Sequence, residues 1–259
     1  MGQKKKETAI VYRQQRIAEG VYDMWIETSI AAQARAGQFI CVYTQDKSAL
    51  LPRPISICET DKDKGRLRIV YRVAGKGTAE FSSYKAEHRI DVLGPLGNGF
   101  PIDNKKKRAV LMGGGIGIPP MLALAKELDC SISKDIVLGY RTNELFLSED
   151  LAKYGTVHIA TEDGSAGIKG NVMDVMETKG IKADIIFACG PLPMLRAIKK
   201  YAEKENIPAY VSLEERMACG VGACLGCVVK TKEKDSHSHV NNARICTDGP
   251  VYFASEVEI

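Results

Sequence analysis

The sequence predicts a multi-domain protein of the β plus α/β class with a small cysteine-rich region at its end. Three observations support this fold class. In residues 8 to about 100, apolar and polar side chains alternate in short segments. From residue 109 onward, short apolar runs alternate with helical patterns, and residues 211–259 carry a glycine-rich run with cysteines at fixed spacing. A length of 259 residues is enough for two domains and an appendage.

The composition is that of an ordinary globular protein, with 45% apolar and 26% charged residues and a net charge of +4, too small to favour nucleic acid as a partner. The basic opening, Met1–Lys6, is not followed by the apolar stretch of a secretory signal. The most apolar segment, Ala109–Ala125, is interrupted by glycines and prolines, so no membrane span is expected. Eight cysteines without a signal peptide indicate a reducing compartment, and we expect the cytoplasm.

In the first region, turn residues separate segments of strand length, which indicates a β-barrel or a β-sandwich. Only Thr78–Ala86 is expected to be helical. The breaker-rich segment Gly94–Pro101 and the basic run Lys105–Arg108 mark a boundary, so the first domain is placed at residues 1–103. The expected strands are Thr8–Tyr12, Val21–Glu27, Gln38–Tyr43, Pro54–Cys58, Arg66–Arg72 and Arg89–Leu93.

The second region, residues 104–210, alternates strands with helices, which is the pattern of a parallel sheet. Its expected strands are Ala109–Met112, Asp135–Gly139, Val157–Ala160 and Asp184–Ala188. Its expected helices are Pro120–Leu128, Glu149–Lys153, Asn171–Met176 and Met194–Glu205. The third region, residues 211–259, adds the strands Gly226–Lys230 and Pro250–Phe253.

The most specific motif is C-x4-C-x2-C-x18-C, formed by Cys219, Cys224, Cys227 and Cys246. This spacing wraps three thiolates around a [2Fe–2S] cluster, and the fourth ligand arrives from a distant segment. The intervening glycines, Gly220, Gly222 and Gly226, permit positive φ, so the loop can aim backbone N–H groups at sulfur.

The alternatives for these cysteines are a zinc site, a disulfide or buried thiols. Zinc sites usually combine two close pairs of ligands, and only one close pair is present. His237 and His239 have a spacing that fits neither zinc nor a Rieske centre, and are expected in a solvated hairpin loop over Lys232–His239. Three further cysteines have no partners at ligand spacing and are expected to be small buried hydrophobes: Cys41, Cys58 and Cys130.

A glycine-rich turn follows the first strand of the α/β region and opens a helix. In the run Met112–Pro120, glycines at 113, 114, 115 and 117 let the backbone approach a pyrophosphate at the helix N-terminus. Pro119 and Pro120 suit the first helical turn, where a missing N–H costs little. The run is not a G-x-G-x-x-G fingerprint, and a plain tight turn is the alternative.

The β region carries two weaker signals for anion binding. Arg53-Pro54-Ile55-Ser56 places a guanidinium and a hydroxyl on one strand, and Gly75–Thr78 precedes a predicted helix with Thr78 as a candidate N-cap. A salt bridge at Arg53 and a hairpin turn at the glycines are the alternatives.

Taken in order with Cys189-Gly190-Pro191, these motifs resemble the ferredoxin reductase family of flavoproteins over residues 8–210. The resemblance implies an antiparallel β-barrel that binds FAD and an α/β domain that binds a nicotinamide nucleotide. With the cysteine run Met217–Cys227 added, nearly the whole chain is similar to the electron-transfer subunits of class 1B dihydroorotate dehydrogenases.

The resemblance also implies roles for individual residues. The FAD phosphates and flavin edge would be held by the Arg53–Ser56 strand, the flavin would be lined by residues 69–72, and the pyrophosphate would lie at Gly77 and Thr78. Gly113, Gly114, Gly115 and Gly117 would face the nucleotide, with Cys189 and Gly190 beside the nicotinamide. The full FAD set is Arg53, Pro54, Ile55, Ser56, Ile69, Val70, Tyr71, Arg72, Gly77 and Thr78.

One departure from the family pattern concerns the flavin faces. Ile55 occupies the place of a tyrosine that packs on the flavin in many reductases, and the chain does not end in an aromatic residue. Tyr71 is the candidate cover. Arg141 could grip a 2′-phosphate or a ribose, and the resemblance favours NAD.

The resemblance implies that a partner subunit oxidises dihydroorotate at its own FMN, in a heterotetramer with two chains of each kind. Electrons would pass through the cluster to FAD and leave as hydride to NAD⁺. We expect no acid–base residue for orotate in this chain, and no nucleic acid or membrane partner. His88 and His158 are interpreted as structural.

Two rival functions remain open. One is an NAD(P)-linked FAD and [2Fe–2S] subunit of a hydrogenase or of a ferredoxin:NADP⁺ transhydrogenase. The other is a metal-binding regulatory module without enzymatic activity.

Overall fold

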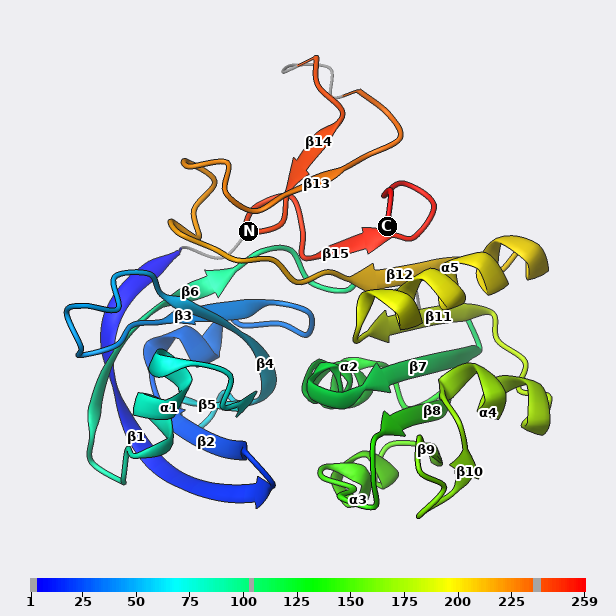
Figure 1. The fold of residues 1–259 in the computed structure, drawn as a ribbon, viewed down its shortest axis with the longest axis horizontal. Coiled ribbons are helices and arrows are strands. Elements are labelled where there is room, and N and C mark those ends of the chain that lie inside the picture. Colours follow the sequence, from blue (N-terminus) through cyan, green and yellow to red (C-terminus); the bar gives the residue numbers. More distant parts are fainter. Residues whose placement is uncertain (1–3, 103–104, 235–238) are drawn as a thin grey trace.

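The computed structural model describes residues 4–102, 105–234 and 239–259, which fold into three parts (Figure 1). A β-barrel lies at the left of the view and a sheet covered by helices at the right. The cysteine-rich region lies above both. The predicted barrel, parallel-sheet domain and C-terminal region are therefore confirmed.

The barrel consists of six antiparallel strands in the closed order β1-β2-β5-β4-β3-β6. Its interior is filled by aliphatic and aromatic side chains, among them Ile26, Leu67 and Phe81, each less than 1% exposed. Two strands have the predicted bounds and the others are longer or shifted at their ends. The strands are β1 (Lys5–Ala18), β2 (Val21–Glu27), β3 (Phe39–Val42), β4 (Arg53–Asp61), β5 (Arg66–Arg72) and β6 (Arg89–Leu96).

Two short helices belong to the barrel, η1 (Ser29–Ala32) and α1 (Lys76–Ser82). The prediction that Thr78 caps α1 is wrong, because the helix begins two residues earlier and has Gly75 as its N-cap. The Thr78 hydroxyl instead lies in the first turn, where it accepts hydrogen bonds from the N–H groups of Ala74 (2.8 Å) and Gly75 (3.2 Å). It stabilises the same helix end from inside the turn.

The second part is a seven-stranded sheet in the order β10-β9-β8-β7-β11-β12-β15. All its neighbours are parallel except β12 and β15, which pair antiparallel. The strands are β7 (Arg108–Gly114), β8 (Ser133–Tyr140), β9 (Thr156–Thr161), β10 (Ile168–Lys169), β11 (Ile185–Cys189), β12 (Ala209–Ser212) and β15 (Val251–Phe253). The short strands β10 and β12 were not expected from the sequence.

Helices cover both faces of this sheet (Figure 1). On β7, Leu111 packs with the helices on the barrel side, whereas Val110 packs with the helices on the opposite face. This alternation follows from the two-residue period of a strand buried on both faces. The barrel-side helices are α2 (Pro119–Glu127) and α3 (Ser148–Ala152), and the others are α4 (Val172–Lys179) and α5 (Leu192–Glu205).

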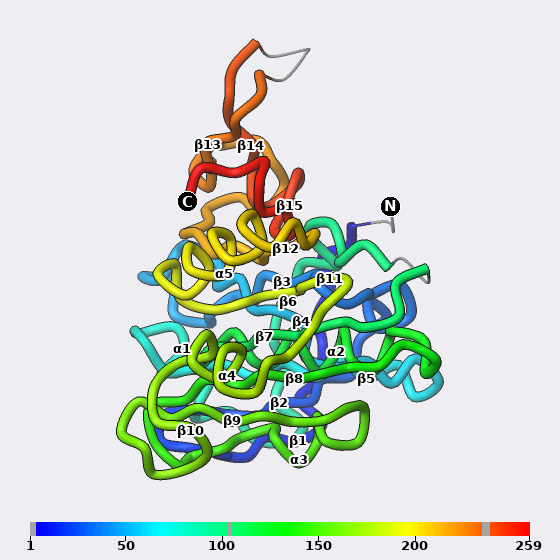
Figure 2. Tube along the Cα trace, turned by 90° about the vertical axis from the view of Figure 1, so that its right-hand side faces the viewer, coloured from blue at the N-terminus to red at the C-terminus, as the bar shows by residue number. Residues whose placement is uncertain are grey.

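The third part contains a small hairpin of β13 (Val228–Lys230) and β14 (Asn242–Arg244). It lies at one end of the molecule in the turned view (Figure 2). The chain then returns to the large sheet through β15, and the predicted boundary between residues 210 and 211 falls inside β12. Part of the predicted loop Lys232–His239, including His237, lies outside the described residues, and His239 is exposed.

The eight cysteines, all within the described part of the chain, are free thiols. Cys41 and Cys58 are completely buried, as predicted, but Cys130 is exposed. That prediction was wrong because Cys130 lies in the turn after α2 rather than in an element. No helix in the described ranges is both long and apolar enough to span a membrane.

Candidate functional site

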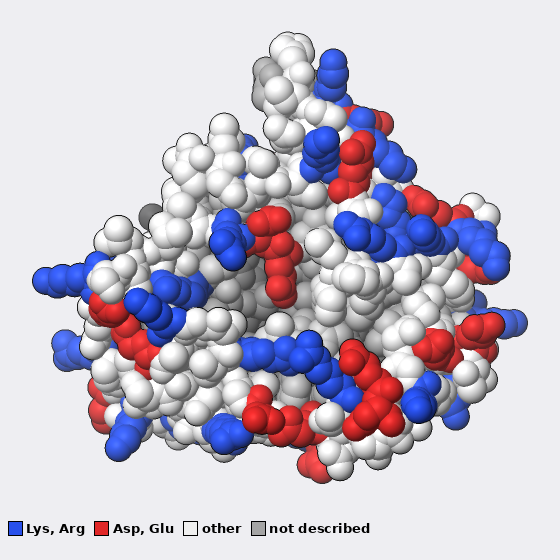
Figure 3. Space-filling view, viewed as in Figure 1, with Lys and Arg blue, Asp and Glu red and all other residues white. Residues whose placement is uncertain are grey.

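A cleft of about 670 Å³ lies where the carboxyl ends of the parallel strands face the barrel. Ala18, Val21 and Arg72 form its barrel side, and the glycine turn after β7 forms its floor. Figure 3 shows the molecule hollowed between these two parts, with acidic and basic side chains at the hollow. Ligands of open α/β sheets bind at this edge, so the cleft is the candidate nucleotide site.

The predicted glycine turn forms the 3₁₀ turn η2 (Gly115–Gly117), directly before α2. Gly115 has φ +53°, in the left-handed region that favours glycine. A Cβ on Gly117 would overlap the carbonyl oxygen of Cys189, so this glycine lets the turn pack against the end of β11. Gly114, Gly115 and Gly117 line the cleft, whereas Gly113 is buried behind them against Ile118.

Cys189 and Gly190 lie at the carboxyl end of β11, beside the same cleft. Gly190 lines the cleft, but the Cys189 side chain is only 1% exposed and burial raises the pKa of its thiol. The Cys189 thiol therefore does not reach the cleft.

The sequence interpretation missed most of the polar side chains in the cleft. Glu162 follows β9, Asn171 precedes α4 and Glu214 follows β12. The Glu214 side chain is exposed to the cleft. The cleft walls nevertheless surround its carboxyl closely, and this partial burial raises the pKa of that group. Their common signal was position next to the carboxyl ends of parallel strands. Arg141, noted from the sequence, also lines the cleft and is exposed.

The candidate flavin residues on β4 divide between two sides of the barrel wall. Ile55 is 7% exposed and packs in the barrel core, whereas Pro54 and Ser56 are half-buried on the outer side. On β5, Ile69 and Tyr71 also point into the core, whereas Val70 packs toward α2 and Arg72 reaches the cleft. Among these outer residues, Pro54, Ser56 and Arg72 have side chains with exposed surface, whereas the Val70 side chain is buried.

Tyr71 is not placed to cover a flavin face. Its side chain is 2% exposed, its hydroxyl donates to Gln14 Oε1 at 2.7 Å, and its ring packs edge-on against Phe81. Any contact of Ile55, Ile69 or Tyr71 with FAD would therefore use the backbone.

Arg53 and Gly77 are brought together at the start of α1. A Cβ on Gly77 would overlap the Arg53 guanidinium, which also donates to the carbonyl oxygens of Ala49 (3.2 Å) and Leu51. A flexible cation over the glycine of a helix start suits a phosphate group. This pair fits the predicted pyrophosphate site.

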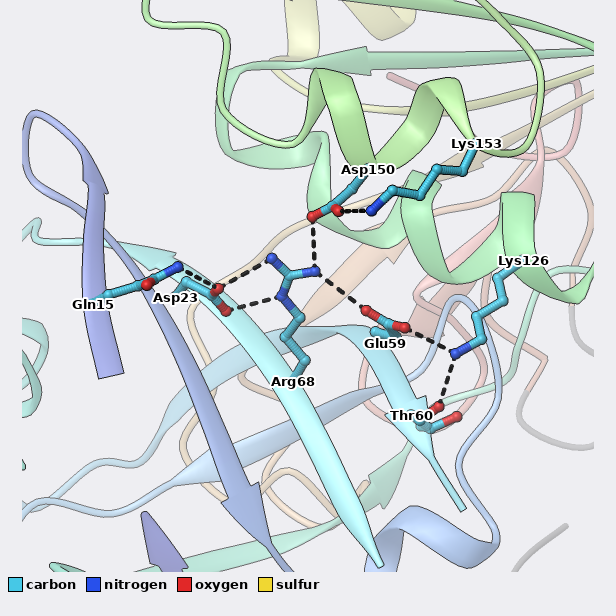
Figure 4. A network of polar contacts seen from close by, with 8 residues as sticks. All are labelled: Gln15, Asp23, Glu59, Thr60, Arg68, Lys126, Asp150 and Lys153. Carbon is cyan, nitrogen blue, oxygen red and sulfur yellow. Dashed lines mark hydrogen bonds and ion pairs between the residues drawn. The ribbon is translucent and has the colours of Figure 1, made fainter. Parts of the chain in front are cut away.

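A network of ion pairs fixes the barrel against the nucleotide domain (Figure 4). Arg68 on β5 binds the fully buried Asp23 through two hydrogen bonds of 2.9 and 3.0 Å. It also contacts Glu59 at 3.2 Å and Asp150 of α3 at 3.0 Å. Lys126 of α2 adds a 2.8 Å contact to Glu59 across the same boundary between the two domains, here called the domain seam. The two walls of the cleft are thus held by charges that bridge both domains.

The titration of Asp150 reflects this network. Burial alone would raise the pKa of its carboxyl, but hydrogen bonds from Lys153 and Arg68 outweigh burial and lower it. The carboxylate is therefore charged at neutral pH and available to both cations.

The four predicted cluster cysteines lie on one loop and one neighbouring turn. Cys227 and Cys246 are 3% and 1% exposed, Cys219 is half-buried and Cys224 is exposed. Ile245 N–H donates to the Cys227 carbonyl at 2.8 Å, which brings the fourth cysteine to the loop. Of the three glycines predicted to permit positive φ, Gly220 (φ +68°) and Gly222 (φ +88°) adopt it, whereas Gly226 does not and the preceding Leu225 does (φ +55°).

The thiols are arranged as two pairs. Cys224 is one of the side chains that lower the pKa of Cys219, and Cys227 is one of those that raise the pKa of Cys246. Within residues 4–102, 105–234 and 239–259, no three or more His, Cys, Asp or Glu side chains converge on a single metal position. Two pairs of thiols fit the two irons of a Cys₄ [2Fe–2S] cluster better than a single tetrahedral zinc ion.

The pKa values of the thiols differ between the exposed side of the loop, where backbone N–H groups act on Cys219, and the buried side, where burial acts on Cys246. The N–H of Val221 donates to Cys219 Sγ at 3.4 Å and, with further N–H groups of the loop, lowers the pKa of Cys219 to about 6. Burial raises the pKa of Cys246 to about 12. A thiolate that is favoured by loop amides is the chemistry a cluster ligand needs.

His158 and His88 are outside these sites. His158 Nε2 lies 2.7 Å from Asp135 Oδ1 between β9 and β8, and the His88 ring stacks on Tyr84 with ring centroids 3.9 Å apart. Both contacts agree with a structural interpretation.

Two family models match the chain. Residues 10–100 match an oxidoreductase FAD-binding domain. Residues 214–258 match the iron–sulfur cluster binding domain of dihydroorotate dehydrogenase B. Both matches fall on the parts assigned above to flavin and cluster.

Curated relatives extend the similarity over nearly the whole chain. The dihydroorotate dehydrogenase B (NAD(+)) electron transfer subunit of Bacillus caldolyticus is 43% identical over 97% of this chain and 98% of that protein. The subunit of the same name from Streptococcus mutans is 42% identical over the same shares.

Among solved structures, an NADH-dependent reduced ferredoxin-NADP oxidoreductase superposes with a TM-score of 0.87. It is 32% identical and covers 96% of this chain and 89% of its own. The ferredoxin reductase of a carbazole 1,9a-dioxygenase, with a TM-score of 0.68 and 19% identity, shares the fold.

Proposed function

Since the chain belongs to the family of dihydroorotate dehydrogenase B electron transfer subunits, we propose that its cysteine loop docks on an FMN-containing dihydroorotate dehydrogenase catalytic subunit, two chains of each kind forming the complex. The chain itself is an electron transfer subunit that uses FAD, an iron–sulfur cluster and NAD⁺. It serves the oxidation of dihydroorotate to orotate in pyrimidine biosynthesis.

The observation that carries the docking proposal is the exposure of the loop around Cys224. Cys224 is exposed and is surrounded in sequence by large apolar side chains that water reaches, Val221 at 43% and Leu225 at 62% exposure. Val228 and Val240 of the adjoining hairpin are 40% and 45% exposed. Exposed apolar residues beside an electron carrier mark a protein interface, because electron transfer needs a short gap and a dry contact.

FAD, when bound, exchanges a hydride with the nicotinamide and single electrons with the iron–sulfur cluster. Arg53 and the helix start at Gly77 would hold its pyrophosphate, with Thr78 stabilising that helix end. Pro54, Ser56 and Arg72 would line the flavin by their side chains, and Ile55, Ile69, Val70 and Tyr71 by their backbone.

The glycine turn would hold the nicotinamide nucleotide, with Gly113 supporting it from behind and Cys189 and Gly190 at the ring. Glu162 and Glu144 lie in the cleft with Arg141. Carboxylates there would accept hydrogen bonds from a ribose and repel a 2′-phosphate, which favours NAD over NADP.

Cys219, Cys224, Cys227 and Cys246 would ligate the cluster as two pairs. The boundaries 1–103, 104–210 and 211–259 stay a prediction. A cytoplasmic location is supported by the free thiols, since an oxidising compartment would threaten the exposed ones.

A second candidate is favoured by the high similarity to the NADH-dependent reduced ferredoxin-NADP oxidoreductase over 96% of the chain. In that case the cysteine loop would meet a different catalytic subunit, and reduced ferredoxin would take the place of dihydroorotate.

Purification of the chain with its natural partner separates the two candidates. The first predicts a complex that contains FMN, FAD and iron, and that reduces NAD⁺ when dihydroorotate is added. A complex that reacts with reduced ferredoxin and not with dihydroorotate would overturn it.

The docking face is tested by Leu225→Glu, with Leu50→Glu as the matched control. Leu50 is 83% exposed but lies on a barrel loop. We expect Leu225→Glu to weaken association at least about tenfold, because it buries a charge in the interface. Equal effects of both changes, or no effect of Leu225→Glu, would contradict this placement of the interface.

A further inference from the structure

The cysteine loop, residues 219–227, lies against the outer face of the barrel strand β3. Side chains alternate along this strand. Ile40 and Val42 fill the barrel core, whereas Phe39 and Cys41 point outward and pack with buried side chains of the cysteine-rich region. In Figure 1, β3 and β6 form the side of the barrel nearest to that region. The barrel and the cysteine loop therefore share a packed boundary along β3.

At this boundary, Gly220 brings the loop backbone against the Cys41 thiol. A Cβ on Gly220 would lie 3.0 Å from Cys41 Sγ and 3.3 Å from Leu96 Cδ1, so a larger residue would have to displace its neighbours. Gly220 also has φ +68°, which glycine adopts without strain. The close contact lies directly beside Cys219, one of the proposed cluster ligands.

On its other side, Cys41 adjoins the strand that a flavin would contact. β3 pairs antiparallel with β4, and Cys41 lies opposite Pro54 in that register. Directly opposite residues point to the same face of a sheet, with their Cβ atoms about 5 Å apart. Pro54 is half-buried on this outer face, where its side chain would line the flavin. One thiol thus lies between the neighbour of a cluster ligand and a flavin residue.

The Cys41 thiol has no part in the cluster motif or in the nucleotide cleft. It is a free thiol with no exposed surface. Sulfur is large and polarizable, so it fills the space between the loop and the strand. Because electron tunnelling slows steeply as the gap between packed atoms widens, an atom that closes this gap bears on the rate of transfer.

We propose that Cys41 is a positioning residue for electron transfer within this chain. Its side chain holds the cysteine loop against the flavin strand, and electrons cross between the loop and the barrel at this contact. Each transferred electron leaves the cluster and enters the flavin, while the Cys41 sulfur stays a thiol throughout. The inference rests on the cluster and flavin residues assigned under the proposed function, but not on the identity of the partner subunit.

Cys41→Ala removes the sulfur and leaves a gap between the loop and β4. In the full chain with both cofactors, pulse radiolysis delivers single electrons, and visible absorption follows their redistribution between the cluster and FAD. We expect this rate to fall about tenfold, since displacement of a positioned group by about 1 Å can cost about 100-fold in rate. The two reduction potentials and the rate of hydride transfer from NADH to FAD should not change.

Cys58→Ala is the matched control. Cys58 is also a barrel thiol with no exposed surface, but it packs in the buried cluster that contains the side chains of α2. The same atom is removed from an equally buried place, so the rate of redistribution should stay unchanged. Equal slowing in both variants would overturn the inference, because loss of a core atom in general would then explain the result.

A second measurement tests the contact without any activity. Gly220→Ala places a methyl group against Cys41 Sγ, so it should lower the urea concentration at which the cluster absorption is lost. Adding Cys41→Ala empties the space that the methyl needs, and the double variant should lose less than the two single changes together. Gly222→Ala is the control, because a Cβ there would meet Thr247 at 2.8 Å, and Cys41→Ala should not rescue it.

An unchanged redistribution rate in Cys41→Ala, or a double variant whose losses simply add, would overturn the inference and leave the cluster assignment intact. An unaltered chain without [2Fe–2S] absorption would overturn both. Where Cys41→Ala does not retain both cofactors, Gly220→Ala decides the question, since it widens the same gap from the loop side. It should slow redistribution more than Gly222→Ala, and equal rates in these two variants would contradict the proposal.

Discussion

The nucleotide cleft and the cysteine loop differ in how much of their surroundings this chain supplies. The cleft is walled by two domains, floored by packed glycines and held by the Arg68 network. The loop is built on short strands, and Cys224, Val221 and Leu225 face solvent. A site that works alone must enclose its ligand, whereas a site that passes electrons to another protein must leave one side open.

The largest expected effect is the loss of all activity that depends on the cysteine loop while the activity of the nucleotide cleft is retained. Cys224→Ser removes one ligand from the exposed pair, and we expect loss of the cluster signal and of dihydroorotate-dependent NAD⁺ reduction. FAD should stay bound, and NADH oxidation by artificial acceptors should persist. Visible spectra and both assays measure this.

Cys130→Ser is the control, since Cys130 is also exposed but lies in the nucleotide domain. If NADH oxidation disappeared together with the cluster, the nucleotide cleft and the cysteine loop would not be independent sites.

Gly117→Ala is expected to impair the nucleotide cleft and to leave the cysteine loop intact. Its Cβ would overlap the Cys189 carbonyl, so the turn must move away from β11. Displacement of a positioning element by about 1 Å can cost about 100-fold in rate, and we expect a loss of this order in NADH oxidation. The cluster potential should stay constant.

Gly180→Asn is a suitable control, because Gly180 ends α4 with φ +58°, which asparagine tolerates, and has open space around it. Comparable losses in both variants would mean that general destabilisation, not the turn, explains the result.

Arg68→Met tests whether the cleft depends on both of its walls. Removal of the guanidinium leaves the fully buried Asp23 without its ion pair, which typically costs about 3–5 kcal/mol. Urea denaturation should show this loss, and NADH turnover should fall while the cluster spectrum is retained.

Arg66→Met, on the same strand, removes a half-buried arginine paired with the exposed Glu27 and should change stability little. Equal destabilisation by both variants would argue against a special role of the domain seam.

The smallest expected effect concerns the stability of the barrel. Burial would raise the pKa of Glu7, but hydrogen bonds from Lys5, Ser29 and Thr28 lower it to about 2. Since the folded-state pKa lies below the usual 4.5, the stabilisation is complete above pH 4.5 and is lost as the pH falls toward 2.

We therefore expect Glu7→Gln to cost about 1–2 kcal/mol at neutral pH, after allowance for solvent screening, and almost nothing near pH 2. Denaturation at a series of pH values measures this, and a cost independent of pH would contradict the assignment.

The sequence was sufficient for the long elements and for the cofactor motifs. The bounds of β2 and β5 match the predictions because each strand begins directly after a turn glycine, Gly20 or Gly65, whereas β10 has two residues and gives no periodic signal. The glycine turn and the cysteines were found because their chemistry depends on local spacing.

The cleft side chains could not be found in this way, since Glu162 and Glu214 meet only through the sheet order. The inward direction of Tyr71 was available in principle. Leu67, Ile69 and Tyr71 share one parity on β5, and the first two are core residues by type.

The antiparallel strand β15 bears on how this chain avoids aggregation. It covers the free side of β12, where Val211 pairs with Tyr252. A chain cut after Ser212 would present the unpaired edge of β12, which can recruit strands from other molecules. The cysteine-rich region thus also covers the edge of the large sheet. Removing the whole region should yield insoluble protein, whereas single substitutions of the cysteines should not.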